Sequence, residues 1–311
     1  MTTRQIGNSG LQVSPLCFGG NVFGWTLDEA ASFRILDAFV DGGFNFIDTA
    51  DVYARWVPGN RGGESETILG KWFARSGKRD RVVLATKVGY EMSPDKKGLS
   101  KAYIQEALEA SLKRLQTDRI DLYQSHVDDA NTPLDETLET FQLLVQQGKV
   151  RAIGASNYSA ERLQQALAAR TQTYQCLQPL YNLYDRQNYE EALESVCIEN
   201  NLAVIPYFSL ASGFLTGKYR SEADLAKSAR GGRVKKYLTE RGHRILGALD
   251  VVAKQHNSHP GQVAIAWLLA RPSVTAPIAS ATTIDQLNQL LSATRLKLED
   301  NEVKSLDQAS A

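Results

Sequence analysis

The possible folds of this chain are limited most by a repeated alternation of short apolar runs and longer amphipathic segments. Eight runs are short, rich in β-branched residues and continuously apolar, which is typical of parallel strands covered on both faces. The eight predicted strands are residues 13–18, 44–48, 82–87, 120–125, 150–156, 174–179, 202–207 and 274–278. Eight strand–helix units within 311 residues favour a (β/α)8 TIM barrel of the α/β class over a doubly wound sheet.

Helical patterns lie between the runs, and four of them have recognisable boundaries. The predicted helices cover residues 29–41, 133 to about 147, 260–270 and 284–292. Their boundary signals are Gly42-Gly43, Thr132-Pro133 as N-cap and first helical position, Pro260, and the capping-box pair Thr283 and Gln286. The turn NSG between two short extended runs in 4–13 predicts an N-terminal β-hairpin before the barrel.

The longest stretch without a clear strand is 211–240, which contains four glycines and many charges. Two interpretations stay open for it, a mobile loop and a lid over a cofactor. Because no linker or low-complexity tract divides the chain, we expect a single domain over residues 1–311.

Composition narrows the class of protein. Lys plus Arg and Asp plus Glu both number 35, and this zero net charge argues against nucleic acid or an anionic membrane as a partner. The N-terminal residues lack the apolar core of a signal peptide, and no apolar run approaches the roughly 18 residues that span a bilayer. Isolated cysteines at 17, 176 and 197 indicate buried, reduced thiols. Together these features predict a cytoplasmic protein.

Four polar side chains, called the relay cluster below, stand where apolar runs end: Asp48, Tyr53, Lys87 and His126. In a barrel the carboxyl ends of the strands form one rim, so we expect these four groups to meet there. Carbonyl reduction needs a proton donor, and a nearby ammonium makes a phenol a better one by lowering its pKa. Lys87 is expected to act on Tyr53 in this way, Asp48 to orient Lys87, and His126 to hydrogen-bond the carbonyl oxygen.

Each member of the relay cluster also has a structural interpretation. Asp48 could cap the next turn, with Asp51 as a rival carboxylate, and Lys87 could be a solvated charge at the rim. His126 could be a hydrogen-bonded structural histidine and Tyr53 a packing residue. Their joint occurrence at consecutive strand ends favours the functional interpretation.

At these motifs the chain resembles the aldo-keto reductases along nearly its whole length. The matching segments are FIDTADVY, LATKVG, IDLYQSH, GKVRAIGASNYS, QPLYN and GFLTGKY. The resemblance implies a (β/α)8 barrel that reduces aldehydes or ketones with NADPH, with Tyr53 as proton donor. It also implies a carboxamide-binding set of Ser156, Asn157 and Gln178, with Tyr207 stacked on the nicotinamide.

The resemblance extends to the phosphate-binding segments. It assigns the pyrophosphate loop to Ser209, Leu210, Gly213 and Lys218, and a further anion site to Ser280, Thr282 and Gln286, for which plain helix capping is the alternative. Many relatives pair an arginine with the adenosine 2′-phosphate where this chain has Thr283. NADPH is therefore expected by resemblance, and NADH is not excluded.

Other classes of protein fit the sequence less well. A Rossmann dehydrogenase needs a G-x-G-x-x-G turn, and none of the 23 glycines has another two positions away. A metal-dependent hydrolase needs a ligand cluster, and the four histidines form neither H-x-H nor HExxH. A non-catalytic NADP(H)-binding sensor or accessory subunit of the same fold remains the alternative to an enzyme.

The substrate is expected to be a small carbonyl compound of unspecified identity. Trp25, Trp56 and Tyr90 lie in the predicted loops after the first three strands. They are expected either to line an apolar substrate pocket or to pack the loops themselves. The sequence does not define the oligomeric state.

Overall fold

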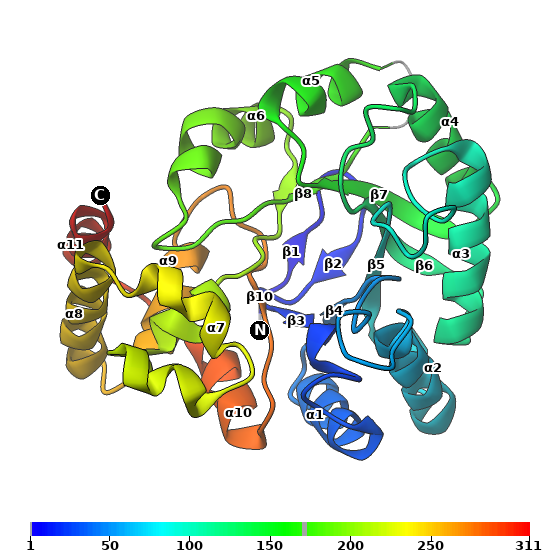
Figure 1. The fold of residues 1–311 in the computed structure, drawn as a ribbon. Helices are drawn as coiled ribbons and strands as arrows, with labels where there is room; N and C mark the ends of the chain where they lie inside the picture. Colours follow the sequence, from blue (N-terminus) through cyan, green and yellow to red (C-terminus); the bar gives the residue numbers. More distant parts are fainter. Residues whose placement is uncertain (1, 170–172) are drawn as a thin grey trace.

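The computed structural model describes residues 2–169 and 173–311, and within them eight parallel strands form one curled sheet (Figure 1). The sheet order is β10-β3-β4-β5-β6-β7-β8-β9, so every neighbour but the closing one is consecutive in the chain. The strands are β3 (Cys17–Gly19), β4 (Phe46–Asp48), β5 (Val83–Val88), β6 (Ile120–Ser125), β7 (Val150–Ser156), β8 (Cys176–Gln178), β9 (Ala203–Val204) and β10 (Ile278–Ala279). The predicted (β/α)8 barrel is confirmed.

Backbone hydrogen bonds outside the named strands close the sheet into a barrel. Thr275 N–H donates to Val204 O at 2.8 Å, and Ile278 N–H donates to Pro206 O at 2.9 Å. The predicted last strand, 274–278, was therefore misplaced, because its first residues only bridge to β9 and the paired strand begins at Ile278.

The predicted first strand, 13–18, was wrong in a more informative way. Its first residue belongs to an N-terminal hairpin of β1 (Arg4–Gln5) and β2 (Gln12–Val13), and its end begins the barrel strand β3. A continuous apolar run does not reveal that Ser14 lies outside both strands, where its N–H donates to Asn45 Oδ1 and its Oγ accepts from Asn45 N–H.

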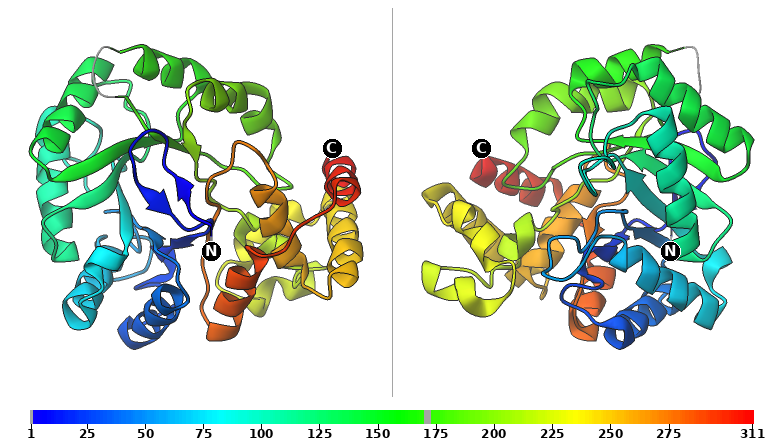
Figure 2. Two further views of the ribbon diagram at one scale, coloured as in Figure 1. Left: turned by 180° about the vertical axis from the view of Figure 1, so that it is seen from behind. Right: turned by 45° about the vertical axis from the view of Figure 1, so that its right-hand side comes forward.

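The hairpin closes one end of the barrel (Figure 2). Ile6, Leu11 and Val13 are buried in one cluster with residues that point into the barrel from seven strands, β3 to β9. Side chains of the hairpin and of the strands thus fill the interior at this end of the barrel, as expected for a packed core rather than a pore. The opposite end, formed by the carboxyl ends of the strands, is left to hold a site.

Helices surround the sheet and cover its outer face, which carries the larger apolar cluster (Figure 1). They are α1 (Glu29–Asp41), α2 (Glu64–Ser76), α3 (Lys101–Leu115), α4 (Leu134–Gln146), α5 (Ala160–Ala168), α6 (Glu194–Glu199), α7 (Gly231–Val234), α8 (Glu240–Gln255), α9 (Pro260–Leu269), α10 (Ile284–Ala293) and α11 (Asp300–Ser310). Among the described residues no helix is both long and apolar enough to cross a membrane.

Three of the four predicted helices begin at the predicted residue, and the fourth begins one residue later. Thr283 caps α10 by accepting from Gln286 N–H, as predicted. Thr132 does not cap α4, because its hydroxyl donates to Asp129 at 2.7 Å and Pro133 takes the N-cap position. A local carboxylate thus outcompetes the helix terminus for the threonine side chain.

Residues 211–240 contain more regular structure than either interpretation of the sequence required. They form η4 (Ala211–Thr216), η5 (Glu222–Lys227), α7 and η6 (Lys235–Tyr237), and then enter α8 at residue 240. Within these short helices, Phe214, Leu215 and Tyr237 are buried in the larger apolar cluster. The segment is therefore a packed part of the rim rather than an unstructured loop.

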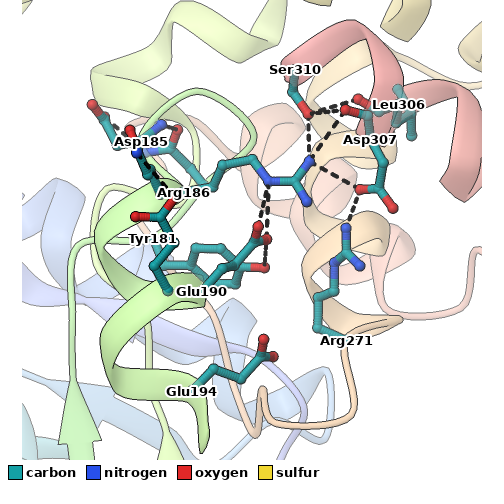
Figure 3. A network of polar contacts seen from close by, with 12 residues as sticks. Tyr181, Asp185, Arg186, Glu190, Glu194, Arg271, Leu306, Asp307 and Ser310 are labelled. Atoms are coloured by element: carbon teal, nitrogen blue, oxygen red, sulfur yellow. Dashed lines mark hydrogen bonds and ion pairs between the residues drawn. The ribbon is translucent and has the colours of Figure 1, made fainter. Parts of the chain in front are cut away.

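The helix α11 is attached to the barrel wall by a cluster of arginines (Figure 3). Arg186, Arg271 and Trp267 Nε1 all donate to the Asp307 carboxylate. Arg186 also donates twice to Glu190, at 2.8 and 3.0 Å, and stacks with its guanidinium 5.1 Å from the Trp267 ring. These contacts join α11 to the segment after β8 and to the end of α9.

Candidate active site

The barrel brings three members of the relay cluster to one rim and the fourth to the adjoining turn. Asp48 is the last residue of β4, Lys87 the fifth residue of β5, and His126 follows β6 directly. The strands are in parallel register, with Asp48 opposite Ala85 and Lys87 opposite Gln124, so their carboxyl ends are level. Tyr53 returns to this rim from the turn after β4.

Lys87 contacts the two oxygen-bearing side chains of the relay cluster. Its Nζ donates to Asp48 Oδ2 at 2.6 Å, to Tyr53 Oη at 2.9 Å and to Thr49 O at 2.8 Å. Tyr53 Oη also lies 3.3 Å from Asp48 Oδ2. Lys87 and Asp48 are buried, and this excludes the interpretation of Lys87 as a solvated rim charge.

The pKa of Tyr53 differs in direction from the sequence expectation. Burial raises the pKa of the phenol well above 10, and the negative charge of Asp48 raises it further. Desolvation therefore outweighs the lowering expected from Lys87, because a phenolate is costly in a site with little water. Tyr53 is a protonated phenol at neutral pH, with the ammonium of Lys87 in hydrogen-bond contact.

His126 is a neutral imidazole. Burial lowers its pKa well below 6.5, and the positive charge of Lys87 acts in the same direction. The ring lies between two aromatic side chains, with centroids 5.9 Å from Tyr53 and 4.3 Å from Tyr90. A neutral ring has one N–H to donate, so His126 has the protonation state required to hydrogen-bond a carbonyl oxygen.

Asp51, the rival carboxylate, lies outside the relay cluster. Its carboxyl is buried, and neither oxygen has a hydrogen-bond partner in the described part of the chain. Burial and the neighbouring charge of Glu66 raise its pKa to about 8. The structure therefore separates the two acids, since only Asp48 contacts Lys87 and Tyr53.

A cleft of about 750 Å³ opens above the relay cluster. Tyr53 and His126 line it, whereas Asp48 and Lys87 lie behind them and do not. Every residue that the resemblance assigned to the cofactor also lines this cleft: Ser156, Asn157, Gln178, Tyr207, Ser209, Leu210, Gly213, Lys218, Ser280, Thr282 and Gln286. Side chains from β7 to β10 are thus gathered at one opening.

At the inner end of the cleft, the predicted carboxamide-binding residues are connected to one another. Asn157 accepts from Tyr207 Oη at 2.8 Å and donates to His126 O at 2.9 Å. Ser156 Oγ donates to Gln178 O at 2.8 Å. Asn157 has a φ of 57°, a left-handed conformation that directs its side chain across the rim.

The segment after β9 exposes its backbone in an uncommon conformation. Phe208, Ala211 and Ser212 have φ values of 53°, 48° and 59°, and Gly213 has 99°. Non-glycine residues in the left-handed region are uncommon, and a run of them indicates a constrained turn that is often part of a site. Two N–H groups of this turn are used within it, because Ala211 donates to Phe208 O at 2.7 Å and Gly213 donates to Leu210 O at 2.8 Å.

The wall of the cleft is cationic. Lys218, Arg230 and Arg233 line it, and no Asp or Glu does so among the described residues. Arg230 Nη2 is buried without a hydrogen-bond partner in residues 2–169 and 173–311. Sequence reasoning did not identify the two arginines, since among the many charges of 211–240 nothing distinguished them. Thr283 is occupied as the cap of α10 and does not line the cleft.

Trp56 and Tyr90 line the cleft, but Trp25 does not. Trp25 lies behind Trp56, with ring centroids 5.7 Å apart, and Arg230 stacks on it at 5.3 Å. These contacts favour the packing interpretation of Trp25. Its ring connects the loop after β3 to the 211–240 segment across the mouth of the cleft.

A barrel with a buried acid–lysine pair behind a cleft-lining tyrosine defines a class of oxidoreductases, and comparison with known proteins identifies the family. The model of the aldo/keto reductase family matches residues 15–311. The chain belongs to this family of oxidoreductases.

Relatives with different names align with it over nearly their whole length. An uncharacterized oxidoreductase YrpG of Bacillus subtilis is 39% identical over 99% of this chain and 95% of its own. An aldo-keto reductase yakc [NADP(+)] of Schizosaccharomyces pombe is 32% identical over 99% and 91%. A probable voltage-gated potassium channel subunit beta of Arabidopsis thaliana is also 32% identical, over 94% and 91%.

Proposed function

We propose that this protein is a carbonyl reductase that uses NADPH to reduce a small aldehyde or ketone, with Tyr53 as the proton donor. The observation that carries the proposal is the placement of one phenol. Tyr53 lines the cleft, while Lys87, 2.9 Å from its oxygen, and Asp48 are buried behind it. A proton can therefore leave toward the cleft while charge is balanced from the protein side.

Each member of the relay cluster has one role in this mechanism. Tyr53 gives its proton to the carbonyl oxygen, and Lys87 stabilises the phenolate that remains. Asp48 keeps Lys87 charged and oriented through their 2.6 Å contact. His126, held neutral, donates its N–H to the carbonyl oxygen and fixes its position. NADPH, when bound, supplies the hydride.

The cleft has the charge and the polar groups that such a cofactor requires. The cofactor carries several phosphate charges, and the cleft offers Lys218, Arg230 and Arg233 without an acidic residue among the described ones. Gly213, with a φ of 99°, lines the cleft without a side chain, so a phosphate group can approach the backbone there. We assign the preference for NADPH over NADH to these cations, since Thr283 is neutral. The name of the Schizosaccharomyces pombe relative, which includes NADP(+), agrees with this assignment.

The test is the loss of NADPH absorbance with a panel of aldehydes and ketones. The wild type is expected to turn over at least one carbonyl, and Tyr53→Phe to lose about 10²–10⁴-fold in kcat while retaining NADPH affinity. Equal activity of Tyr53→Phe, or cofactor binding with no carbonyl turned over, contradicts the proposal.

The second candidate function is a cofactor-binding accessory subunit. It is favoured by the relative in Arabidopsis thaliana that is named as a probable voltage-gated potassium channel subunit beta. The complete relay cluster supports catalysis, because a sensor needs no buried lysine in contact with a phenol. NADPH binding without turnover across the panel is the outcome expected of a sensor. In both cases we propose that residues 1–311 act as one domain.

A further inference from the structure

The Asp48 carboxylate is shared between the relay cluster and two buried amides. Its Oδ2 accepts from Lys87 and Tyr53, at 2.6 and 3.3 Å. Its Oδ1 accepts from Gln178 Nε2 at 2.9 Å and from Gln124 Nε2 at 3.3 Å. The proton-donating side of the site and the predicted carboxamide-binding side thus meet on one buried acid.

Both polar atoms of the Gln124 amide form hydrogen bonds. Besides the bond to Asp48, its Oε1 accepts from Gln178 Nε2 at 3.2 Å and from Cys176 Sγ at 3.7 Å. The side chain is fully buried, and its neighbour along β6, Tyr123, packs outward in the larger apolar cluster. Alternation along the strand therefore directs Gln124 into the barrel on the side of Asp48.

A glycine on the adjacent strand provides the room that Gln124 needs. Gly154 of β7 is paired with Gln124 in the sheet register. A Cβ at this position would lie 3.2 Å from Gln124 Cγ and 2.3 Å from Cys176 Sγ. Any larger residue would displace one or both partners, so the interior here is shaped around the amide and the thiol.

These contacts fix the orientation of the Gln178 amide. Its nitrogen donates to Asp48 and to Gln124, which uses both amide hydrogens. Reversing the amide would put Oε1 2.9 Å from Asp48 Oδ1, with two acceptors facing one another. Gln178 lines the cleft, and its side-chain oxygen Oε1 accepts no hydrogen bond from the described residues. It is therefore available as an acceptor for an N–H group in the cleft.

We propose that Gln124 is a positioning residue, which holds Gln178 with its carbonyl oxygen toward the cleft and so selects a ligand that presents an amide N–H. This inference rests on the proposed function, in which the amide is the carboxamide of the nicotinamide ring. It adds that the residue that recognises this amide, Gln178, and the lysine of the relay cluster, Lys87, are hydrogen-bonded to the same carboxylate, that of Asp48.

The experiment compares the binding of NADP⁺ with that of its 3-acetylpyridine analogue, in which a methyl group replaces the carboxamide NH2. Affinities are measured by isothermal titration calorimetry for the wild type and for Gln124→Met, Gln178→Met and Gln164→Met. The last is the matched control, the same substitution at an exposed position of α5. Thermal melting establishes that each variant is folded before it is titrated.

The wild type and Gln164→Met are expected to favour NADP⁺ by about five- to tenfold, the effect of one hydrogen bond. Gln124→Met and Gln178→Met are expected to bind the two ligands equally, within about twofold. If Gln124→Met does not fold, Gln124→Asn, which keeps an amide but shortens it by one methylene, is expected to show the same loss.

Retention of the NADP⁺ preference in Gln124→Met, together with its loss in Gln178→Met, overturns the role of Gln124. Equal binding of the two ligands by an active wild type overturns the inference and leaves the proposed function standing. Failure of the wild type to bind either dinucleotide overturns the proposed function itself. A merely structural role of Gln124 would weaken both ligands by the same factor and leave their ratio unchanged.

Discussion

Lys87 is a buried cation with three acceptors, namely Asp48, Tyr53 and Thr49 O. Replacing it with methionine removes the positive charge and leaves the Asp48 carboxylate buried with only amide and phenol donors. Breaking a buried ion pair from one side costs about 3–5 kcal/mol. We therefore expect Lys87→Met to lower the free energy of unfolding by about that amount, measured by urea denaturation, and to reduce kcat at least 10²-fold.

The double variant Asp48→Asn/Lys87→Met is the control for this prediction. It removes both charges, so it is expected to recover part of the lost stability without recovering activity. A double variant less stable than Lys87→Met would show that the ion pair is not the source of the effect.

Asp51 gives the protein a distinct dependence of stability on pH. Its pKa is about 8 in the folded protein and about 4 in an unfolded chain, so between these values the folded state holds a proton that the unfolded state has released. The stabilising contribution of the neutral acid is complete below pH of about 4 and is lost as the pH rises through about 8. The slope is at most about 1.4 kcal/mol per pH unit.

Asp51→Asn is expected to remove this slope and to become more stable than the wild type at pH 8–9. The charged groups around Asp51 are Glu66, Arg114 and Lys87, with the phenols of Tyr103 and Tyr123 nearby, and all of them remain in the variant. The measurement is the melting temperature from pH 5 to 9. Parallel curves for the two proteins would assign the pH dependence to other groups.

At the residue scale the sequence located the relay cluster but not its electrostatics. Hydrophobicity along the chain shows where strands end, and this sufficed to bring Asp48, Lys87 and His126 to one rim. The pKa of Tyr53 depends on how much water its phenol loses on folding, which the order of residues does not encode. The role of Gln124 could not be predicted either, because its position depends on the space left by Gly154 on the next strand.

At the scale of elements, the 211–240 segment places a half-buried arginine in the cleft wall. Arg230→Gln removes a cation whose Nη2 has no partner within the described residues. We expect it to weaken NADPH binding about tenfold or more, in keeping with a charge-assisted hydrogen bond, and to reduce the salt dependence of binding. The measurement is titration of NADPH fluorescence at two salt concentrations.

Lys254→Gln serves as the comparison, since Lys254 is exposed on α8 and also loses one positive charge. It is expected to bind NADPH as the wild type does. Equal weakening by the two substitutions would attribute the effect to net charge rather than to the position of Arg230.

Element boundaries were predictable where local signals fixed them and not where distant contacts did. The N-cap of Thr283 and the first-turn proline of α9 lie in the sequence next to the helices they begin. The start of β10 is set by pairing with a residue far along the chain, since Ile278 pairs with Cys17 of β3. The chain leaves the hairpin at Ser14, whose N–H donates to Asn45. Trp25 likewise has its place behind Trp56 because Arg230 packs on it from a segment about 200 residues away.

At the scale of the whole molecule, Asp307 joins α11 to two other elements through Arg186, Arg271 and Trp267 (Figure 3). Asp307→Ala leaves two partly buried guanidinium groups near one another without this carboxylate. We expect a loss of about 2–4 kcal/mol in the free energy of unfolding, with unchanged NADPH affinity in the folded protein. Chemical denaturation and cofactor titration of the same sample test both parts, and a loss of affinity without a loss of stability would contradict them.

The hairpin that closes the base of the barrel has a consequence for how the chain is made. Ile6, Leu11 and Val13 are synthesised well before their buried partners, which include Ala203, Ile205 and Ala276. Arg4 donates to Val274 O at 2.6 Å, so the same segment reaches almost to the last strand. The apolar side chains of the hairpin therefore stay exposed during translation until the chain has been made as far as Ala276, and only then can the base of the barrel be sealed.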